Sequence, residues 1–187
     1  MTFPESRPPR SSGSDQGEFS PAGDSSGANS PMSAWPETDM RYMRAALAKA
    51  TEARSVDEVP VGAVVVVGDA IAGTGHNHSI RNCDPTAHAE IIALREAAKA
   101  IGNYRVADGT VYVTLEPCPM CIGAMLHARI RRLVFGAYDP KAGAAGSVID
   151  LCSERRLNHR IEVNGGLLAD ECGDLLKGFF AARREAP

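Results

Sequence analysis

The sequence has few of the features that would place a protein outside the cell or in a membrane. Its 187 residues include five cysteines, an odd number without the spacing of a disulfide framework. No apolar run is long enough to span a bilayer, and the N-terminus has no basic start followed by an apolar stretch. These absences predict neither secretion nor membrane insertion, and they make the cytoplasm the expected location.

The chain is also poor in aromatic residues and has no excess of positive charge. Aromatics make up 5% of the residues, and 20 Lys and Arg stand against 23 Asp and Glu, for a net charge of −3. Bulk charge therefore gives no indication of nucleic-acid binding. Arginines nevertheless cluster in the last third of the chain, where they either contact phosphates or form a solvated surface. The clusters are Arg129, Arg131 and Arg132, then Arg155, Arg156 and Arg160, then Arg183 and Arg184.

Composition divides the chain into a short first part and a longer second part. Residues 1–36 hold half of the twelve prolines and many serines and glycines, with only scattered apolar residues. Such a segment buries too little apolar surface to offset the entropy lost on ordering, so we predict a disordered extension. Residues 37–187 are long and apolar enough for one domain with its own core.

The second part alternates between helical and strand-like patterns. Apolar residues at three- and four-residue spacing after Thr38 and Asp39 predict an amphipathic helix, and β-branched runs ended by turn signals predict strands. Strands that alternate with helices form a sheet between helical layers. We therefore predict an α/β fold with a mixed sheet of about five strands, in the order helix 40–50, strand 59–67, strand 70–75, helix 85–100, strand 110–115, helix 119–128, strand 132–137, strand 158–163 and helix 169–184.

Two short segments carry the residues of a metal centre. The first has the sequence HAE and begins at His88, and the second has the sequence PCPMC and contains Cys118 and Cys121. One imidazole and two thiolates leave the fourth position of a zinc tetrahedron free for water, whereas a structural zinc usually has four protein ligands. Glu90, two residues after the histidine, is then a carboxylate available to move the protons of that water.

A Cys-x-x-Cys pair by itself is also typical of a redox pair or of half a structural zinc site. The upstream histidine and glutamate favour the catalytic centre over both. Cys118 and Cys121 come where a strand gives way to a helix, so we expect one near the cap and the other in the first turn. There the helix dipole and a cation stabilise thiolates. His88 is expected in the first turn of the helix predicted at 85–100.

This H-x-E and P-C-x-x-C pattern resembles the known signature of the nucleobase and nucleoside deaminases. The surrounding residues narrow the resemblance to the bacterial tRNA-specific adenosine deaminases. This resemblance extends from about Met40 to Arg184. They are DPTAHAE around His88, VTLEPC before Cys121, and the weaker segments VPVGAV, FGA, GAAGS, NHR and LADEC. The resemblance implies a three-layer α/β/α cytidine deaminase-like fold. It also implies hydrolytic deamination of adenosine to inosine at the wobble position of a tRNA anticodon.

The resemblance further implies one Zn²⁺ per subunit, held by His88, Cys118 and Cys121. It implies a zinc-activated water and makes Glu90 the catalytic proton shuttle. The expected partners are a tRNA anticodon stem-loop and a second copy of the chain in a homodimer. The apolar run after the cysteines suits either a subunit interface or the core; it comprises Ile122, Ala124, Met125 and Leu126.

Substrate-binding roles follow from the resemblance at three positions. Asn77 matches the family's substrate-contacting asparagine, although asparagine is also a common turn residue. Asp139 and Lys141 match a loop that approaches the anticodon, although charged loop residues are common. Between them and the preceding strand the sequence has Tyr138 where the family's best-known form has an arginine. A tyrosine can stack on a base but supplies no positive charge, so this contact is expected to differ in kind.

The end of the chain resembles a terminal helix that lies beside the RNA in this family. Phe179 and Phe180 are either base-stacking surfaces there or anchors in the core. Arg183 and Arg184 follow them.

Two alternative functions remain open from the residues. The catalytic signature does not specify which base is deaminated. A deaminase of a free nucleobase or nucleoside such as cytosine, cytidine or guanine is therefore the second hypothesis. A zinc-stabilised interaction protein without turnover would require an idle Glu90 and a blocked fourth metal position. No fourth ligand with motif spacing is present in the sequence.

Overall fold

The computed structural model describes residues 35–185, so the predicted extension at 1–36 lies almost wholly outside the described residues. No helix in this range is both long and apolar enough to cross a membrane. The elements, in chain order, are α1 (Glu37–Ser55), β1 (Gly62–Val67), β2 (Ala70–His76), α2 (Ser79–Asn82), α3 (Ala89–Ile101), β3 (Thr110–Leu115), α4 (Pro119–Ala128), β4 (Arg132–Ala137), β5 (Glu162–Gly165) and α5 (Ala169–Glu185).

The strands of the described range form one mixed sheet in the order β2-β1-β3-β4-β5. β1 pairs antiparallel with β2 and β3, whereas β3, β4 and β5 run parallel to one another. The short turn at Gly68 and Asp69 returns the chain antiparallel, while α4 carries it back between β3 and β4 so that these strands can be parallel. The prediction of a mixed sheet of about five strands is confirmed.

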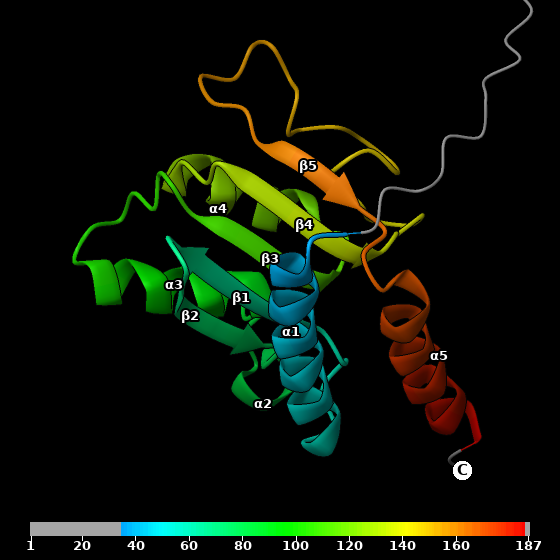
Figure 1. Ribbon diagram of the computed structural model, residues 1–187. Helices are drawn as coiled ribbons and strands as arrows, with labels where there is room; N and C mark the ends of the chain where they lie inside the picture. Colours follow the sequence, from blue (N-terminus) through cyan, green and yellow to red (C-terminus); the bar gives the residue numbers. More distant parts are fainter. Residues whose placement is uncertain (1–34, 186–187) are drawn as a thin grey trace, which may run out of the picture. The chain divides into compact units, whose positions relative to one another are not determined.

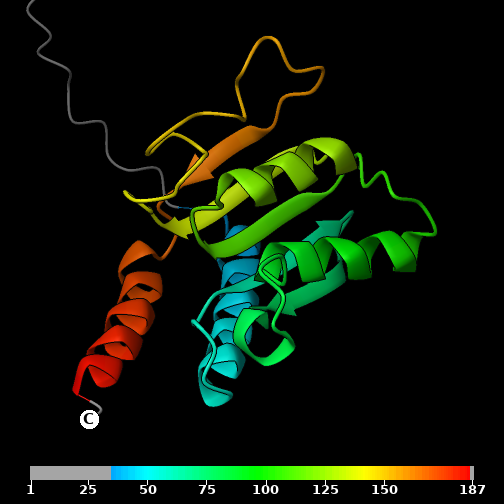
Figure 2. The ribbon, with the colours of Figure 1, turned by 180° about the vertical axis from the view of Figure 1, so that it is seen from behind.

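Helices cover both faces of this sheet, and the alternation of side chains along each strand separates the two cores. On β1, Ala63 and Val65 pack in a cluster with residues of α3 and α4, while Val64 and Val66 pack in a second cluster with residues of α1 and α5. Figure 1 shows α1 and α5 on one side of the sheet, and the view from behind in Figure 2 shows α3 and α4 on the other. The predicted three-layer α/β/α arrangement is therefore confirmed.

Two glycines on β2 allow α3 to lie close against that strand. A β-carbon at Gly73 would lie 2.3 Å from the carbonyl oxygen of Ala93, and one at Gly75 would lie 2.3 Å from the carbonyl oxygen of Ala89. Either methyl group would push the helix away, because a packed interior has no room to absorb it. These glycines therefore help to fix the N-terminus of α3, which follows His88.

The predicted start of the second long helix is wrong. Instead of beginning at Pro85, α3 begins at Ala89, because the carboxylate of Asp84 accepts the backbone N–H of Thr86 at 2.8 Å and holds a turn there. His88 is consequently the N-cap residue and has an extended backbone, rather than lying in the first turn. The short helix α2 was not predicted.

Two predicted strand boundaries are also wrong. The first strand begins at Gly62 instead of residue 59, since Pro60 has no N–H to donate to a ladder and the N–H of Val61 donates to the carbonyl of Val59 at 2.7 Å. The strand predicted at 158–163 is β5, which begins at Glu162. The N–H of the residue before it, Ile161, donates to the loop carbonyl of Cys152 at 3.1 Å instead.

An ion pair with a hydrogen-bonded tyrosine joins α1 to the sheet. The guanidinium of Arg132 donates two bonds of 2.9 Å to the carboxylate of Asp39, and the hydroxyl of Tyr112 donates a third of 2.6 Å. Burial would raise the pKa of Asp39, but the bonds from Arg132 and Tyr112 outweigh burial and hold the pKa below its usual range. Arg132 of the first arginine cluster is therefore an internal contact.

Candidate metal centre and substrate pocket

The candidate metal ligands lie at the N-termini of two helices that pack on the same face of the sheet. His88 is the N-cap residue of α3, and Cys118 is the N-cap residue of α4. Cys121 lies in the first turn of α4, as predicted, after Pro119 at the first helical position. The parallel crossover from β3 through α4 brings these cysteines to the histidine, which precedes them by 30 residues or more.

The distances within this group match those of a zinc tetrahedron. Nδ1 of His88 lies 3.7 Å from Sγ of Cys118 and 3.6 Å from Sγ of Cys121, and the two sulfurs are 3.7 Å apart. With Zn–S about 2.3 Å and Zn–N about 2.0–2.1 Å, tetrahedral angles separate two sulfurs by about 3.8 Å and a sulfur from a nitrogen by about 3.6 Å. The three residues therefore fit a tetrahedral ion, and in the described part of the chain they are the candidate metal group.

The electrostatics of the two thiols suit a cation. The hydrogen bond between the sulfurs lowers the pKa of Cys118 to about 4, and the His88 imidazole adds to this effect. The same hydrogen bond and burial raise the pKa of Cys121. The pKa of His88 is raised, chiefly by its hydrogen bond with Cys118. Because the thiolate is the form that binds metal, a cation bound to these sulfurs would displace their thiol protons.

Glu90 lies beside the metal group without belonging to it. Its side chain is buried in the first turn of α3, and it lines a pocket of about 330 Å³ together with His88 and Cys118. Burial raises the pKa of this carboxyl group. The arrangement places a carboxyl group that can carry a proton next to the candidate metal group.

Asn77 lies on the wall of the same pocket, directly after β2. Its side-chain oxygen accepts the backbone N–H of Ala89 at 2.9 Å, which satisfies one of the free donors at the start of α3. This bond orients the carboxamide and leaves its NH₂ group available to a ligand. The structure thus brings Asn77 to the metal group.

The loop after β4 also lines the pocket. Asp139 lines the pocket, but one oxygen of its carboxylate accepts the backbone N–H of Lys141 at 2.9 Å and that of Ala142 at 3.2 Å. Lys141 does not line the pocket and is exposed on the same loop. Tyr138 is 59% exposed, and its ring packs in a T-shaped arrangement with that of Phe135, with 5.0 Å between ring centroids. A large part of the tyrosine surface is therefore free.

The terminal helix contributes both core and surface residues. Phe179 is buried, whereas Phe180 is 45% exposed, so the expectation of a core anchor holds for the first phenylalanine only. Arg183 stacks over the ring of Phe179 at 4.6 Å and donates to the carbonyl of Asp57 at 2.8 Å. That bond joins α5 to the loop that leads into β1.

Two buried carboxylates of the pocket were missed by the sequence analysis. Glu58 accepts the backbone N–H of Ile80 at 3.2 Å and of Arg81 at 2.7 Å, and thereby holds the start of α2 on the pocket wall. Glu116 holds the loop after β4 through several bonds. Burial would raise the pKa of Glu116, but bonds from Ser147 and from backbone N–H groups outweigh burial and lower it. Each glutamate adjoins an apolar run in the sequence, which was the available signal.

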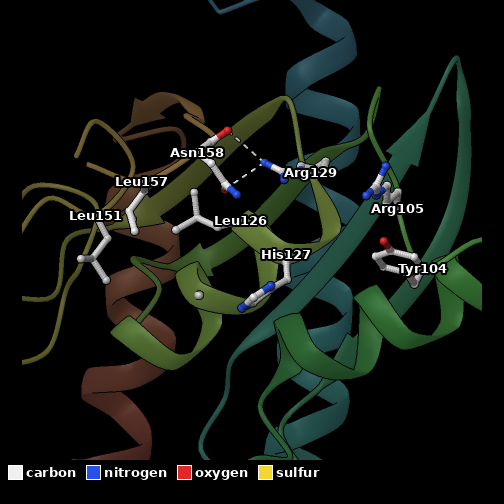
Figure 3. Close-up of a pocket in the computed structure, with 9 residues that line it drawn as sticks. Tyr104, Arg105, Leu126, His127, Arg129, Leu151, Leu157 and Asn158 are labelled. Carbon is white, nitrogen blue, oxygen red and sulfur yellow. Dashed lines mark hydrogen bonds between the residues drawn. The ribbon is translucent and has the colours of Figure 1, made fainter. Parts of the chain in front are cut away.

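A second pocket, of about 400 Å³, lies along α4 instead of at its N-terminus (Figure 3). Tyr104, Arg105 and His127 line it, as does Arg129, whose guanidinium donates to the carbonyl and side-chain oxygens of Asn158 at 3.0 and 3.1 Å. None of these residues belongs to the metal group. Arg129, which opens the first arginine cluster, is thus held against a loop of its own chain.

The fold and the metal group define a class of protein. Residues 37–184 match the model of the MafB19-like deaminase family, and this match covers most of the chain. The protein is a deaminase of that family.

Relatives narrow the assignment within this class. The chain is 56% identical over 151 residues to a tRNA-specific adenosine deaminase of Haemophilus influenzae, covering 80% of this chain and 87% of the relative. It is 44% identical over 147 residues to a tRNA-specific adenosine deaminase of Bacillus subtilis, covering 79% and 91%. A solved structure from work on A-to-I editing by tRNA:A34 deaminases has a TM-score of 0.71 and 42% identity, covering 73% of this chain and 99% of that chain. The chain belongs to the family of tRNA-specific adenosine deaminases.

Proposed function

We propose that the protein hydrolyses adenosine to inosine at the wobble position of a tRNA anticodon, releasing ammonia. One observation carries this proposal. A chain that is 56% identical to a tRNA-specific adenosine deaminase places a three-ligand metal group and a buried carboxyl group in one pocket. We assign the deaminase domain to residues 37–187, and the family match over 37–184 supports that boundary.

His88, Cys118 and Cys121 hold one zinc ion per subunit in this proposal. Zinc, when bound, supplies a Lewis acid that lowers the pKa of a water molecule to about 7. The protein contributes the geometry. Two helix N-termini fix three ligand atoms at tetrahedral distances, and no carboxylate of the described residues joins the group as a fourth ligand.

Glu90 moves the protons of the reaction. Hydrolysis requires that both protons of the water leave its oxygen, one going to the ring nitrogen beside C6 and the other to the departing amino group. A single carboxyl group next to the metal ligands can serve these steps in turn, because each proton travels within the same pocket. Burial of Glu90 also keeps bulk water from taking the proton.

The pocket walls orient the base in this proposal. Asn77 offers its NH₂ group to the substrate, since Ala89 already occupies its oxygen. Asp139 and Lys141 hold the neighbouring nucleotides from the loop after β4, and the exposed ring of Tyr138 offers a stacking surface there. A base of a single-stranded anticodon loop can flip into such a pocket at low free-energy cost, because it has little base pairing to lose.

The test compares substrates. Purified protein is incubated with an anticodon stem-loop that has adenosine at the wobble position, with the same stem-loop carrying guanosine there, and with free adenosine, cytidine and guanine. We expect inosine from the adenosine stem-loop at a kcat/KM at least about 10²-fold above that for free adenosine, because neighbouring nucleotides supply binding energy that a nucleoside lacks. Comparable efficiency on a free base or nucleoside would overturn the tRNA assignment and favour the second hypothesis.

We also propose that the protein is a homodimer that works in the cytoplasm, where tRNA is its substrate. The family resemblance and a mainly apolar groove between α3 and α4 support the dimer; Leu94, Ala98, Met120 and Ala124 are among the residues that line this groove. Ile122 and Met125 are buried in the core, so half of the apolar run after the cysteines does not reach an interface. Light scattering coupled to size-exclusion chromatography tests the dimer, and a monomeric mass at micromolar concentration would contradict it.

A further inference from the structure

The carboxylate of Glu116 is buried between the metal-ligand segment and the loop after β4. It is 2% exposed. One oxygen accepts the backbone N–H groups of Ala145 at 3.1 Å and Ser147 at 3.0 Å, and the other accepts the N–H of Asp139 at 3.0 Å and the hydroxyl of Ser147. An ionised carboxylate has about four acceptor sites. Four donors therefore fill the acceptor capacity of Glu116, and none remains for a substrate or a metal ion.

The backbone beside Glu116 is bonded to the same loop. The N–H of Glu116 donates to the carbonyl of Ala137 at 2.8 Å, and the N–H of Ala144 donates to the carbonyl of Pro117 at 2.8 Å. Pro117 directly precedes the candidate ligand Cys118. The loop is thus joined by main-chain and side-chain bonds to the segment that ends in a metal ligand.

The loop after β4 packs tightly against the carboxylate of Glu116. A β-carbon at Gly143 would lie 2.4 Å from Cδ and from Oε2 of Glu116, so glycine is required for the loop to pass this near. The same loop carries Asp139, which lines the pocket, and Lys141, whose N–H the Asp139 carboxylate accepts. The positions of both residues relative to the metal group therefore depend on Glu116.

We propose that Glu116 is a positioning residue that sets the affinity for RNA by fixing the loop 138–147 against the metal-ligand segment. This inference rests on the function proposed above, because it gives the loop a role in holding the nucleotides beside the reacting base. Glu116 acts on substrate through the loop and takes no part in the transfer of protons. Its loss should therefore change KM more than kcat.

Glu116→Gln tests the proposal with little change in volume. A carboxamide has one acceptor oxygen and one NH₂ group that cannot accept these bonds. The NH₂ group therefore faces either the N–H of Asp139 and the hydroxyl of Ser147, or the N–H groups of Ala145 and Ser147. In both orientations one side of the loop loses its acceptor. We expect KM for the stem-loop to rise about tenfold, the factor that corresponds to losing one hydrogen bond to a charged group. Zinc content should equal that of the wild type, and kcat should stay within about threefold.

A second variant perturbs the contact from the other side. Gly143→Ala keeps the carboxylate and displaces the loop by steric contact, so it should reproduce the KM increase of Glu116→Gln. Glu162→Gln is the matched control, because Glu162 lies on β5, its side chain is 59% exposed and its nearest ion-pair contact is 3.8 Å long. This control should have the KM and kcat of the wild type.

Hydrogen–deuterium exchange of peptides covering 138–147 gives a readout that does not depend on turnover. Either the amide of Asp139 or the amides of Ala145 and Ser147 should exchange faster in Glu116→Gln than in the wild type or in Glu162→Gln, because the side of the loop that faces the NH₂ group loses its buried acceptor. Unchanged exchange, loss of zinc, or a fall in kcat at constant KM would overturn the proposal. Faster exchange with unchanged KM would also overturn the role in affinity. If the wild type does not deaminate the stem-loop while the loop of the variant still exchanges faster, the proposed function fails and the structural contact stands.

Discussion

Replacing Arg132 with methionine should measure how strongly the ion pair on the α1 face of the sheet stabilises the fold. Arg132 donates two 2.9 Å bonds to Asp39, whose side chain is 4% exposed, and methionine keeps the aliphatic stem while removing the charge. The carboxylate is then left buried with only the hydroxyl of Tyr112 as a side-chain donor. We expect destabilisation, because the desolvation of Asp39 is no longer offset.

The expected magnitude follows from that geometry. Breaking a buried, bidentate pair by removing one partner costs about 3–5 kcal/mol, and the remaining Tyr112 bond places the expected value near the lower limit, about 3 kcal/mol. For a domain of this size each kcal/mol lowers the melting temperature by about 2–4 °C, so a decrease of about 6–12 °C is expected. Asp39→Asn combined with Arg132→Met should recover part of this loss, because no buried charge is then left unpaired.

Urea unfolding followed by tryptophan fluorescence provides the assay. Trp35 is the single tryptophan, and it packs against the core cluster that contains Tyr112. The midpoint should fall while the slope m is unchanged. The control is Arg156→Met, whose ion pair with Glu154 lies on the surface with the arginine 88% exposed, and its urea midpoint should equal that of the wild type. A loss below about 1 kcal/mol for Arg132→Met would refute this account of the ion pair.

Further variants test the metal site, the proton carrier, the substrate contacts and the dependence of stability on pH. Elemental analysis should find about one zinc per subunit, and Cys118→Ala should lose both zinc and turnover; an active metal-free enzyme would contradict the three-ligand site. Glu90→Ala should keep zinc while kcat falls by at least about 10²–10⁴-fold, and normal turnover in a zinc-loaded variant would exclude Glu90 as the proton carrier. Lys141→Ala should lower kcat/KM for the stem-loop about tenfold without changing zinc content or the melting temperature, and equal effects on free adenosine would speak against an RNA contact. The pKa of Asp39 is lower in the folded than in the unfolded protein, so its contribution to stability is complete above about pH 5 and is lost as pH falls through the folded pKa. Urea midpoints measured at decreasing pH from about pH 6 should therefore fall less steeply in Asp39→Asn than in the wild type.

The local chemistry of the metal centre could be predicted from the sequence because it depends on neighbours along the chain. Cys118 and Cys121 are three residues apart at the start of a helix, so a strand-to-helix transition places both sulfurs on one side of a helix N-terminus. Runs of β-branched residues similarly predict β1 and β3, whose side chains separate into two cores. Short-range sequence patterns determine these features without knowledge of the fold.

Features that depend on partners distant in the sequence could not be predicted in this way. The N-terminus of α3, which follows His88, lies close to the sheet because Gly73 and Gly75 of β2 admit the helix. β5 begins later than predicted because the loop before it bonds elsewhere.

The buried carboxylates show the same limit most clearly. Glu116 and Glu58 look like ordinary polar residues between apolar segments, and Asp39 looks like a helix-capping residue. Only the tertiary structure brings Glu116 to the N–H groups of a loop 23 to 31 residues away, and Asp39 to an arginine 93 residues away. The sequence determined which groups can bind a metal and carry a proton, because those properties belong to residue types at fixed short spacings. The tertiary structure decided which groups hold the pocket in shape. A buried charge is tolerated only where the folded chain brings hydrogen-bond donors next to it, and these donors come from distant parts of the sequence.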